Sequence, residues 1–122
     1  MDKISNSYSN TPFDLNDKNA VITGGAGLLG KEFCKALASA GAKIVLIDNN
    51  KEKIDDAKME IQKVFPKSSV ISYCADVFNI NSIGKCISSI KNKLKNIDVL
   101  VNSAAIDPKF EQGTNVTNYS SF

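Results

Sequence analysis

Short apolar runs alternate with amphipathic stretches through most of the chain. Four runs, at residues 20–23, 42–47, 70–75 and 97–101, have the length and apolar character of buried strands. Between them, apolar side chains recur at helical spacing, which predicts helices from about Leu28 to Ala40, from the capping residues Asn49 and Asn50 to about Phe65, and from Asn79 or Asn81 to Leu94. The side chains that we expect to face the core are Leu29, Phe33, Ala36, Leu37 and Ala40 in the first helix, Ile54, Ala57, Ile61, Val64 and Phe65 in the second, and Ile83, Ile87, Ile90 and Leu94 in the third.

Strict alternation of strands and helices predicts an α/β fold of the Rossmann type, with a doubly wound parallel sheet. With four strands the sheet is an incomplete version of that fold, and we expect the strand order 3-2-1-4. Ligands of such sheets bind beyond the carboxyl ends of the strands, here between the first and fourth strands. Residues 1–17, rich in Ser, Asn and Asp, are expected to form a flexible leader whose last part, 12–15, packs on the sheet. Residues 18–106 are expected to form the folded unit, a dinucleotide-binding Rossmann half.

Composition narrows the class of partner. The net charge of +2 rests on lysines that are spread through the predicted helices, and the chain has no arginine, which argues against nucleic-acid binding. No segment has the run of about 20 apolar residues that a membrane span needs, and the amino terminus lacks a signal-peptide pattern, so we expect a cytoplasmic chain with no membrane partner. Cys34, Cys74 and Cys86 are widely spaced and no histidine accompanies them, which predicts three buried thiols and no metal site.

The most informative segment joins the first strand to the first helix. It contains Gly24, Gly27 and Gly30, three apart, in a turn that opens onto a helix N-terminus. In such a turn the first glycine permits the bend, the second lets the backbone approach a pyrophosphate, and the third lets the helix pack closely on the sheet. The alternative is a tight turn that binds nothing.

Polar residues follow the next three predicted strands. Asp48 is placed to accept the ribose hydroxyls of an adenosine and to repel a 2′-phosphate, which favours NAD over NADP; its alternative role is to cap a helix. Asp76 is placed to accept from an adenine amino group, or else to form the turn that ends its strand. Asn102 would stand beside the ligand, and its amide would tie the fourth strand to the glycine turn.

The blocks Thr23–Gly30, Asp48, Asp76–Val77 and Asn102–Ala105 together resemble the short-chain dehydrogenase/reductase family. The resemblance implies an oxidoreductase that transfers a hydride between a nicotinamide cofactor, here NAD, and an alcohol or carbonyl substrate. It places Asp48 at the adenosine ribose, Asp76 with Val77 at the adenine, and residues 102–104 at the second ribose. The resulting cofactor-binding residues are Gly24, Gly27, Leu28, Leu29, Gly30, Asp48, Asn49, Asp76, Val77, Asn102, Ser103 and Ala104.

Three features depart from the family pattern. Leu28 stands where the shorter branch carries glycine, whereas Gly27 with Gly30 fits the extended branch, which modifies nucleotide sugars. Ser103 and Ala105 replace residues of the strand-4 block, Asn-Asn-Ala-Gly, of the shorter branch. The family's catalytic Tyr-x-x-x-Lys pair is absent, so the resemblance implies a cofactor-binding half, with residues 107–122 as an irregular tail that leads into a missing catalytic half. Homo-oligomers are then expected for a full-length form alone.

Two other functions remain open at this point. Without the tyrosine and lysine, the chain is also a candidate for a dinucleotide-binding module without catalysis. Residues 25–31 match the G-x-x-x-x-G-K part of a phosphate-binding loop of an NTPase, but Glu32 occupies the position of the hydroxyl that would hold Mg²⁺. Binding of ATP rather than NADH would favour that reading.

Overall fold

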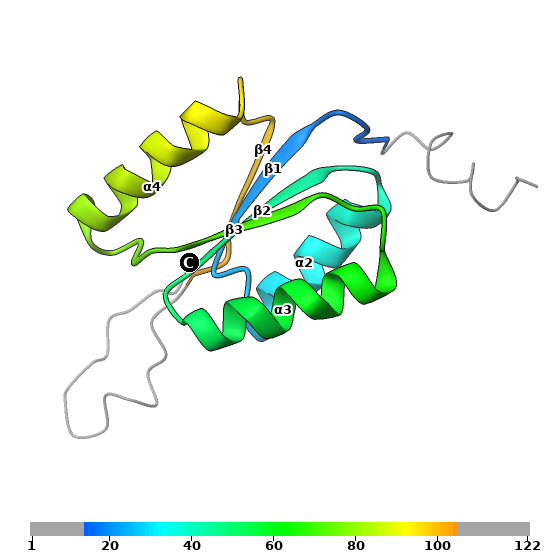
Figure 1. Ribbon diagram of the computed structural model, residues 1–122, viewed down its shortest axis with the longest axis horizontal. Coiled ribbons are helices and arrows are strands. Elements are labelled where there is room, and N and C mark those ends of the chain that lie inside the picture. The colour runs from blue at the N-terminus through cyan, green and yellow to red at the C-terminus, as the bar shows by residue number, and fades with distance from the viewer. Residues whose placement is uncertain (1–13, 105–122) are drawn as a thin grey trace, which may run out of the picture.

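A computed structural model describes residues 14–104, which form a four-stranded parallel sheet in the order β3-β2-β1-β4 (Figure 1). The expected Rossmann-type topology is therefore confirmed. The predicted flexible leader and irregular tail fall largely on residues 1–13 and 105–122, which lie outside the described residues. The elements are β1 (Asn19–Thr23), α2 (Leu28–Ser39), β2 (Lys43–Asp48), α3 (Lys51–Val64), β3 (Val70–Cys74), α4 (Ile80–Lys93) and β4 (Val99–Asn102).

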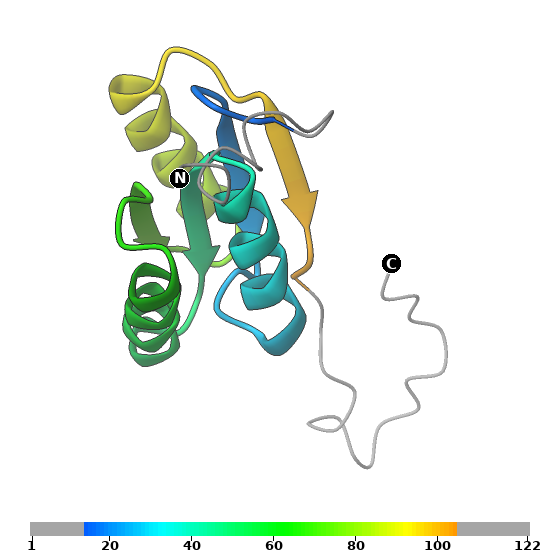
Figure 2. The ribbon, with the colours of Figure 1, turned by 90° about the vertical axis from the view of Figure 1, so that its right-hand side faces the viewer.

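Helices α2 and α3 cover one face of the sheet, and α4 covers the other (Figures 1 and 2). Successive side chains of a strand point to opposite faces, so each strand contributes to two cores. Ile22 and Leu46 belong to the core under α2 and α3, whereas Val21, Val45 and Ile47 belong to the core under α4. Both faces of β1 and β2 are thus buried, which explains why these strands are almost wholly apolar.

The buried face of α2 differs from the one expected from the sequence. Gly30, Cys34 and Ala38 are its buried residues, whereas Ala36 is exposed and Leu29 is 62% exposed. These small residues let the helix lie close to the strands, and its rotation follows from the contact of Gly30 with the glycine turn. The expectation was correct for Leu37, which packs against the core.

The other two helices follow the sequence pattern more closely. Ile54, Ala57 and Ile61 are buried in α3, and Phe65 packs against the same core. Val64, expected inside, is 55% exposed because it is the last residue of the helix and lies beyond the edge of the core.

Helix α4 buries Cys86 and Ile90, with Ile83 and Leu94 packed beside them. Ile87, also expected to face the core, is 41% exposed because Cys86 takes the central position of the stripe.

Asparagine side chains begin two of the helices. Asn50 accepts the N–H of Lys53 at 3.1 Å, and Asn79 accepts the N–H of Ser82 at 3.0 Å. Each bond satisfies one of the amides that a helix leaves unpaired in its first turn. Of the capping alternatives that the sequence offered, Asn50 and Asn79 are therefore the caps of α3 and α4.

At the amino ends of the strands, polar contacts fasten β4 to β1. The N–H of Asn19 donates to Asp98 Oδ2 at 2.8 Å, and the N–H of Asp98 donates to the carbonyl of Asn19 at 2.9 Å. Leu15 packs against the core under α2, and its N–H donates to the carbonyl of Ala40 at 2.8 Å. The bonds between Asn19 and Asp98 set the position of β4, whose other end carries Asn102.

Replacing Leu46 by alanine is expected to lower the free energy of unfolding by about 2–5 kcal/mol, because it empties a site at the centre of the core under α2 and α3. Urea denaturation of the 122-residue chain measures the change. Met59 is 70% exposed, so Met59→Ala is the matched control, with an expected change within about 0.5 kcal/mol. Equal effects of the two substitutions would contradict this assignment of the core.

Candidate functional site

The carboxyl ends of the parallel strands bring most of the expected site residues to one edge of the sheet. Thr23 pairs in register with Asn102 on one side and with Ile47 on the other, and Asp48 pairs with Cys74. The turn formed by residues 24–27 leaves β1 at this edge and leads into α2. The glycine turn, Asp48 and residues 102–104 are therefore neighbours in space.

Gly24 and Gly30 let three elements pack closely. Gly24 has a φ of 66°, and a Cβ on it would lie 2.7 Å from the backbone nitrogen of Ala104. A Cβ on Gly30 would meet the carbonyl oxygen of Gly24 and would lie 2.8 Å from Ser103 Oγ. Glycine at both positions is thus required for β1, α2 and the end of β4 to meet.

Gly27 has a different environment. It is the N-cap residue of α2, and a Cβ on it would meet a single neighbour, the carbonyl oxygen of Gly24, at 3.3 Å. The missing side chain therefore leaves the space in front of the helix N-terminus open, as the close approach of a pyrophosphate requires.

The amides of residues 25–27 in the turn donate to acceptors within the protein. The N–H of Gly25 donates to the carbonyl of Ile47, that of Ala26 to Asp48 Oδ2, and that of Gly27 to the carbonyl of Gly24, each at 3.1 Å. The donors that remain for an anion therefore begin after the turn.

Those donors are the amides of Leu28, Leu29 and Gly30, in the first turn of α2. Within residues 14–104 they have no acceptor, since the N-cap Gly27 has no side chain to supply one. The first turn carries no acidic residue, whereas α3 and α4 have asparagine caps. Free amides and the helix dipole make this N-terminus suited to bind a phosphate group.

Leu28 and Leu29 extend into solvent beside these amides, and their exposed fractions are 86% and 62%. Leu29 was expected both in the core and beside the cofactor, and the structure places it outside the core. Large exposed apolar side chains next to free amides give the site an apolar border.

Asp48 is half-buried at the end of β2, and three backbone amides hold its carboxylate. Oδ1 accepts the N–H of Asn49 at 2.8 Å and that of Asn50 at 3.2 Å, while Oδ2 accepts the N–H of Ala26 at 3.1 Å. The alternative role as a helix cap is wrong, because Asn50 caps α3. Asn49 is exposed, and its amide helps to orient Asp48.

Asp76 and Val77 follow β3, two strands away from the glycine turn. Asp76 Oδ1 accepts the N–H of Phe78 at 2.9 Å, and the N–H of Asp76 donates to Ser82 Oγ at 2.9 Å. Asp76 thus forms the turn that ends its strand, with an exposed carboxylate, and Val77 packs against the core under α4. Among the described contacts, neither residue touches the glycine turn.

At the end of β4, Asn102 and Ser103 join this strand to β1. The hydroxyl of Thr23 donates to Asn102 Oδ1 at 3.2 Å, so the amide of Asn102 ties the strands through Thr23. The hydroxyl of Ser103 donates to the carbonyl of Thr23 at 2.7 Å and lies 3.4 Å from the carbonyl oxygen of Gly24. Sequence reasoning missed this tie by Ser103, although a small polar residue directly after a strand beside a glycine turn signals it.

The three cysteines differ from one another. Cys34 lies beneath the turn with Sγ 3.9 Å from the carbonyl oxygen of Gly25, and burial raises the pKa of its thiol to about 12. Burial also raises the pKa of the Cys86 thiol. Cys74, expected to be buried, is exposed because it ends the edge strand β3. In the part of the chain that the structure describes, no group of histidine, cysteine and acidic residues is arranged to hold a metal ion.

Lys31 does not take the role that it would have in the phosphate-binding loop of an NTPase. Its Nζ lies 3.1 Å from Glu60 Oε1 on α3. Lys35 also pairs with Glu60, and its Nζ lies 3.2 Å from Glu32 Oε2. The hydrogen bonds of Lys35 and Lys31 with Glu60 lower the pKa of Glu60 and join α2 to α3. The bond with Glu60, and to a smaller extent that with Glu32, raises the pKa of Lys35.

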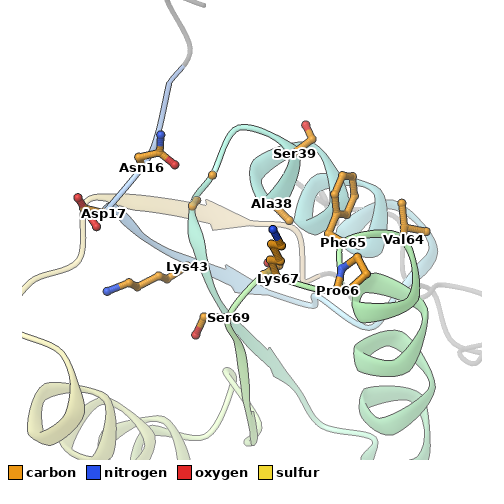
Figure 3. A pocket seen from close by; sticks show the side chains of 13 residues that line it. Asn16, Asp17, Ala38, Ser39, Lys43, Val64, Phe65, Pro66, Lys67 and Ser69 are labelled. Atoms are coloured by element: carbon orange, nitrogen blue, oxygen red, sulfur yellow. The ribbon is translucent and has the colours of Figure 1, made fainter. Parts of the chain in front are cut away.

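A groove of about 520 Å³ lies at the opposite edge of the sheet, near the amino ends of β2 and β3 (Figure 3). Lys43, Phe65 and Lys67 are among the side chains around it. Because it is at the other end of the strands, it takes no part in the site described above.

Comparison with known proteins identifies the family. The model of the family described as short chain dehydrogenase matches residues 18–121, so the chain belongs to that family. A short chain dehydrogenase/reductase of Macrophomina phaseolina is 35% identical over 98 residues, which cover 80% of this chain and 55% of that protein. An NAD-dependent glycerol dehydrogenase of Listeria innocua is 33% identical over 94 residues, which cover 77% of this chain and 35% of that protein.

Solved structures agree with this assignment. Levodione reductase matches with a TM-score of 0.74 and 28% identity, over 83% of this chain and 40% of the reductase. NAD⁺-bound xylitol dehydrogenase matches with a TM-score of 0.70 and 27% identity, over 75% of this chain and 35% of the dehydrogenase. A metagenomic short-chain oxidoreductase in complex with NADP matches with a TM-score of 0.70 and 28% identity, over 76% of this chain and 41% of that protein.

The family is one of oxidoreductases that use nicotinamide cofactors. This chain spans 35–55% of the length of the two curated relatives named above. No helix among residues 14–104 is long and apolar enough to cross a membrane.

Gly30→Ala is expected to lower the free energy of unfolding by about 1–3 kcal/mol, because the new methyl group would overlap the Gly24 carbonyl. Gly84, in the middle of α4, has no atom within 4 Å of the position that a Cβ would take. Gly84→Ala should therefore raise the stability by up to about 1 kcal/mol through helix propensity alone. Thermal and urea unfolding of both variants measure the difference, and a stabilising Gly30→Ala would contradict the close contact.

Proposed function

We propose that this chain binds a nicotinamide dinucleotide at the carboxyl edge of its sheet and is the cofactor-binding part of an oxidoreductase. The observation that carries the proposal is the row of free amides at the start of α2, next to the carboxylate of Asp48. When bound, the nicotinamide ring supplies hydride transfer to or from an alcohol or carbonyl carbon.

The residues of the site fit such a ligand. The amides of residues 28–30 would hold the pyrophosphate, with Gly27 leaving the space for it. Asp48 would accept the hydroxyls of the adenosine ribose, and Asp76, whose carboxylate is exposed, and Val77 would hold the adenine. Asn102 and Ala104, at the end of β4, would face the second ribose, while Gly24, Gly30 and Ser103 keep the turn in shape.

The charges around Asp48 favour NAD over NADP. A 2′-phosphate placed at the adenosine ribose would face the Asp48 carboxylate and the neutral side chains of Asn49 and Asn50. Lys51 is the nearest cation along the chain, and its Nζ lies 3.2 Å from Asp55 Oδ1 on the same helix.

The catalytic pair of the family is not part of this proposal, because no tyrosine of the printed sequence is followed by lysine four residues later. A dinucleotide-binding module without catalysis is therefore the second candidate. Both candidates predict that the 122-residue chain binds NADH and does not oxidise it in the presence of carbonyl compounds. A Tyr-x-x-x-Lys pair encoded downstream of Phe122 would favour the first candidate, and a stop codon directly after Phe122 would favour the second. None of the contacts among residues 14–104 favours the extended branch, which modifies nucleotide sugars. We propose homo-oligomers only for a longer form of the protein.

Titration of NADH with the 122-residue chain should raise NADH fluorescence in a saturable way, because binding takes the ring out of water. Gly27→Val should abolish this signal by filling the space in front of α2, while circular dichroism and thermal unfolding stay close to those of the wild type. Normal binding by Gly27→Val would place the phosphates elsewhere. Saturable binding of ATP without binding of NADH would overturn the proposal.

Asp48→Ala is expected to weaken NADH binding by about 10- to 100-fold, since charge-assisted hydrogen bonds to the ribose are lost. The affinity for NADPH should fall less than that for NADH, or should rise, because the repulsion between the Asp48 carboxylate and the 2′-phosphate disappears. The ratio of the two dissociation constants, measured by the same titration, therefore moves toward NADPH. An unchanged ratio would count against Asp48 as the ribose acceptor.

A further inference from the structure

The carboxylate of Asp48 connects two segments that are distant in sequence. Oδ2 accepts the N–H of Ala26 in the glycine turn at 3.1 Å, across 22 positions of the chain. Oδ1 accepts the amides of Asn49 and Asn50, just before α3, at 2.8 and 3.2 Å. The second pair of bonds fixes the orientation of the side chain, so that Oδ2 is directed at the turn.

Neighbouring backbone bonds hold Asp48 in place. Its carbonyl accepts the N–H of Ala75 at 2.8 Å, and the carbonyl of Ile47 accepts the N–H of Gly25 at 3.1 Å. The end of β2 therefore lies between the end of β3 and the glycine turn, and it carries the acceptors for two successive amides of that turn, those of Gly25 and Ala26.

Ala26 has little freedom to find another acceptor. Its residue is 8% exposed and belongs to the core under α2 and α3. A buried amide without a partner is costly, so loss of the carboxylate would force the turn to move. Ala26 directly precedes Gly27, the N-cap of α2, so such a movement changes the orientation of the free amides of residues 28–30.

We infer that Asp48 is a positioning residue, whose carboxylate sets the glycine turn and with it the pyrophosphate-binding amides of α2. This inference rests on the proposed function and adds a second role to the ribose contact. A carboxylate oxygen accepts two hydrogen bonds, so Oδ2 can hold the Ala26 amide and a ribose hydroxyl together.

Asparagine cannot replace Asp48 in this role. A carboxamide offers one acceptor oxygen and one donor NH₂ group, whereas amide donors face both oxygens of Asp48. In Asp48→Asn, an NH₂ group would face either the N–H of Ala26 or the amides before α3. The substitution keeps the size of the side chain and a polar group for the ribose. It loses either the hydrogen bond from Ala26 or the hydrogen bonds from Asn49 and Asn50.

The first test needs no cofactor. In the labelled wild-type chain, NMR should detect a scalar coupling across the hydrogen bond between the Ala26 amide nitrogen and the Asp48 side-chain carboxylate carbon. The Ala26 amide should also exchange with solvent about tenfold faster in Asp48→Asn than in the wild type, as the loss of one charge-assisted bond implies. Absence of the coupling, together with unchanged exchange in Asp48→Asn, would overturn the inference.

The second test uses reduced nicotinamide mononucleotide, which lacks the adenosine half and so has no group for the ribose role of Asp48. Asp48→Ala and Asp48→Asn should each weaken its binding about fivefold or more, because the amides of α2 are displaced. Asp56→Ala removes the same charge from the exposed face of α3 and should leave the affinity unchanged.

The outcomes separate the two claims. If both Asp48 variants lose NADH affinity but bind the mononucleotide as the wild type does, Asp48 contacts the ribose alone and the inference is wrong. If the wild type binds neither NADH nor the mononucleotide, the proposed function fails, and the coupling and exchange of Ala26 still decide whether Asp48 sets the turn. Circular dichroism checks that each variant is folded. If Asp48→Ala does not fold, the binding comparison is made with Asp48→Asn.

Discussion

The contact between the Gly24 carbonyl and Gly30 determines how closely α2 lies against the sheet. Neither glycine has room for a Cβ, because the backbone of residues 103–104 lies on one side of the turn and the helix on the other. This contact rotates α2 so that Cys34 and Ala38 face the core and Leu29 faces solvent. It also brings the helix N-terminus to the point where β1 and β4 end, which is the place that an α/β sheet offers to a ligand.

The hydrogen-bond donors around this point divide into two groups. The amides of residues 25–27 and the hydroxyls of Thr23 and Ser103 bind acceptors of the protein, and they hold the turn, β2 and β4 together. The amides of residues 28–30 are left for a ligand. The first group fixes the turn and therefore the orientation of the free amides that follow it. Donors that are ordered before binding cost little conformational entropy when an anion binds. Asp48 is the acceptor that connects the two groups, because its carboxylate accepts the Ala26 amide of the first group and anchors the turn from which the second group starts.

Much of the fold was predictable because local signals and hydrophobic spacing agreed. Strands as apolar as 42–47 indicate burial on both faces, and Asn50 and Asn79 occupy the starts of their helices as good caps do. The faces of the helices were less predictable. Leu29 has the spacing of a core residue, yet the packing of Gly30 turns it outward, and Ile87 gives way to the smaller Cys86. Apolar spacing does not distinguish a residue that fills a core from one that borders a binding site.

The sequence by itself determined the order of the elements, the strand order and the position of the glycine turn, because each depends on periodicity and on residues with strong local preferences. The tertiary structure alone decided which donors remain free, that the hydroxyl of Ser103 binds the carbonyl of Thr23, and that Asp48 reaches the amide of Ala26. These contacts join residues that are far apart in the chain, and their geometry follows from how closely three strand ends approach one helix. A linear pattern of residue types carries no such distance.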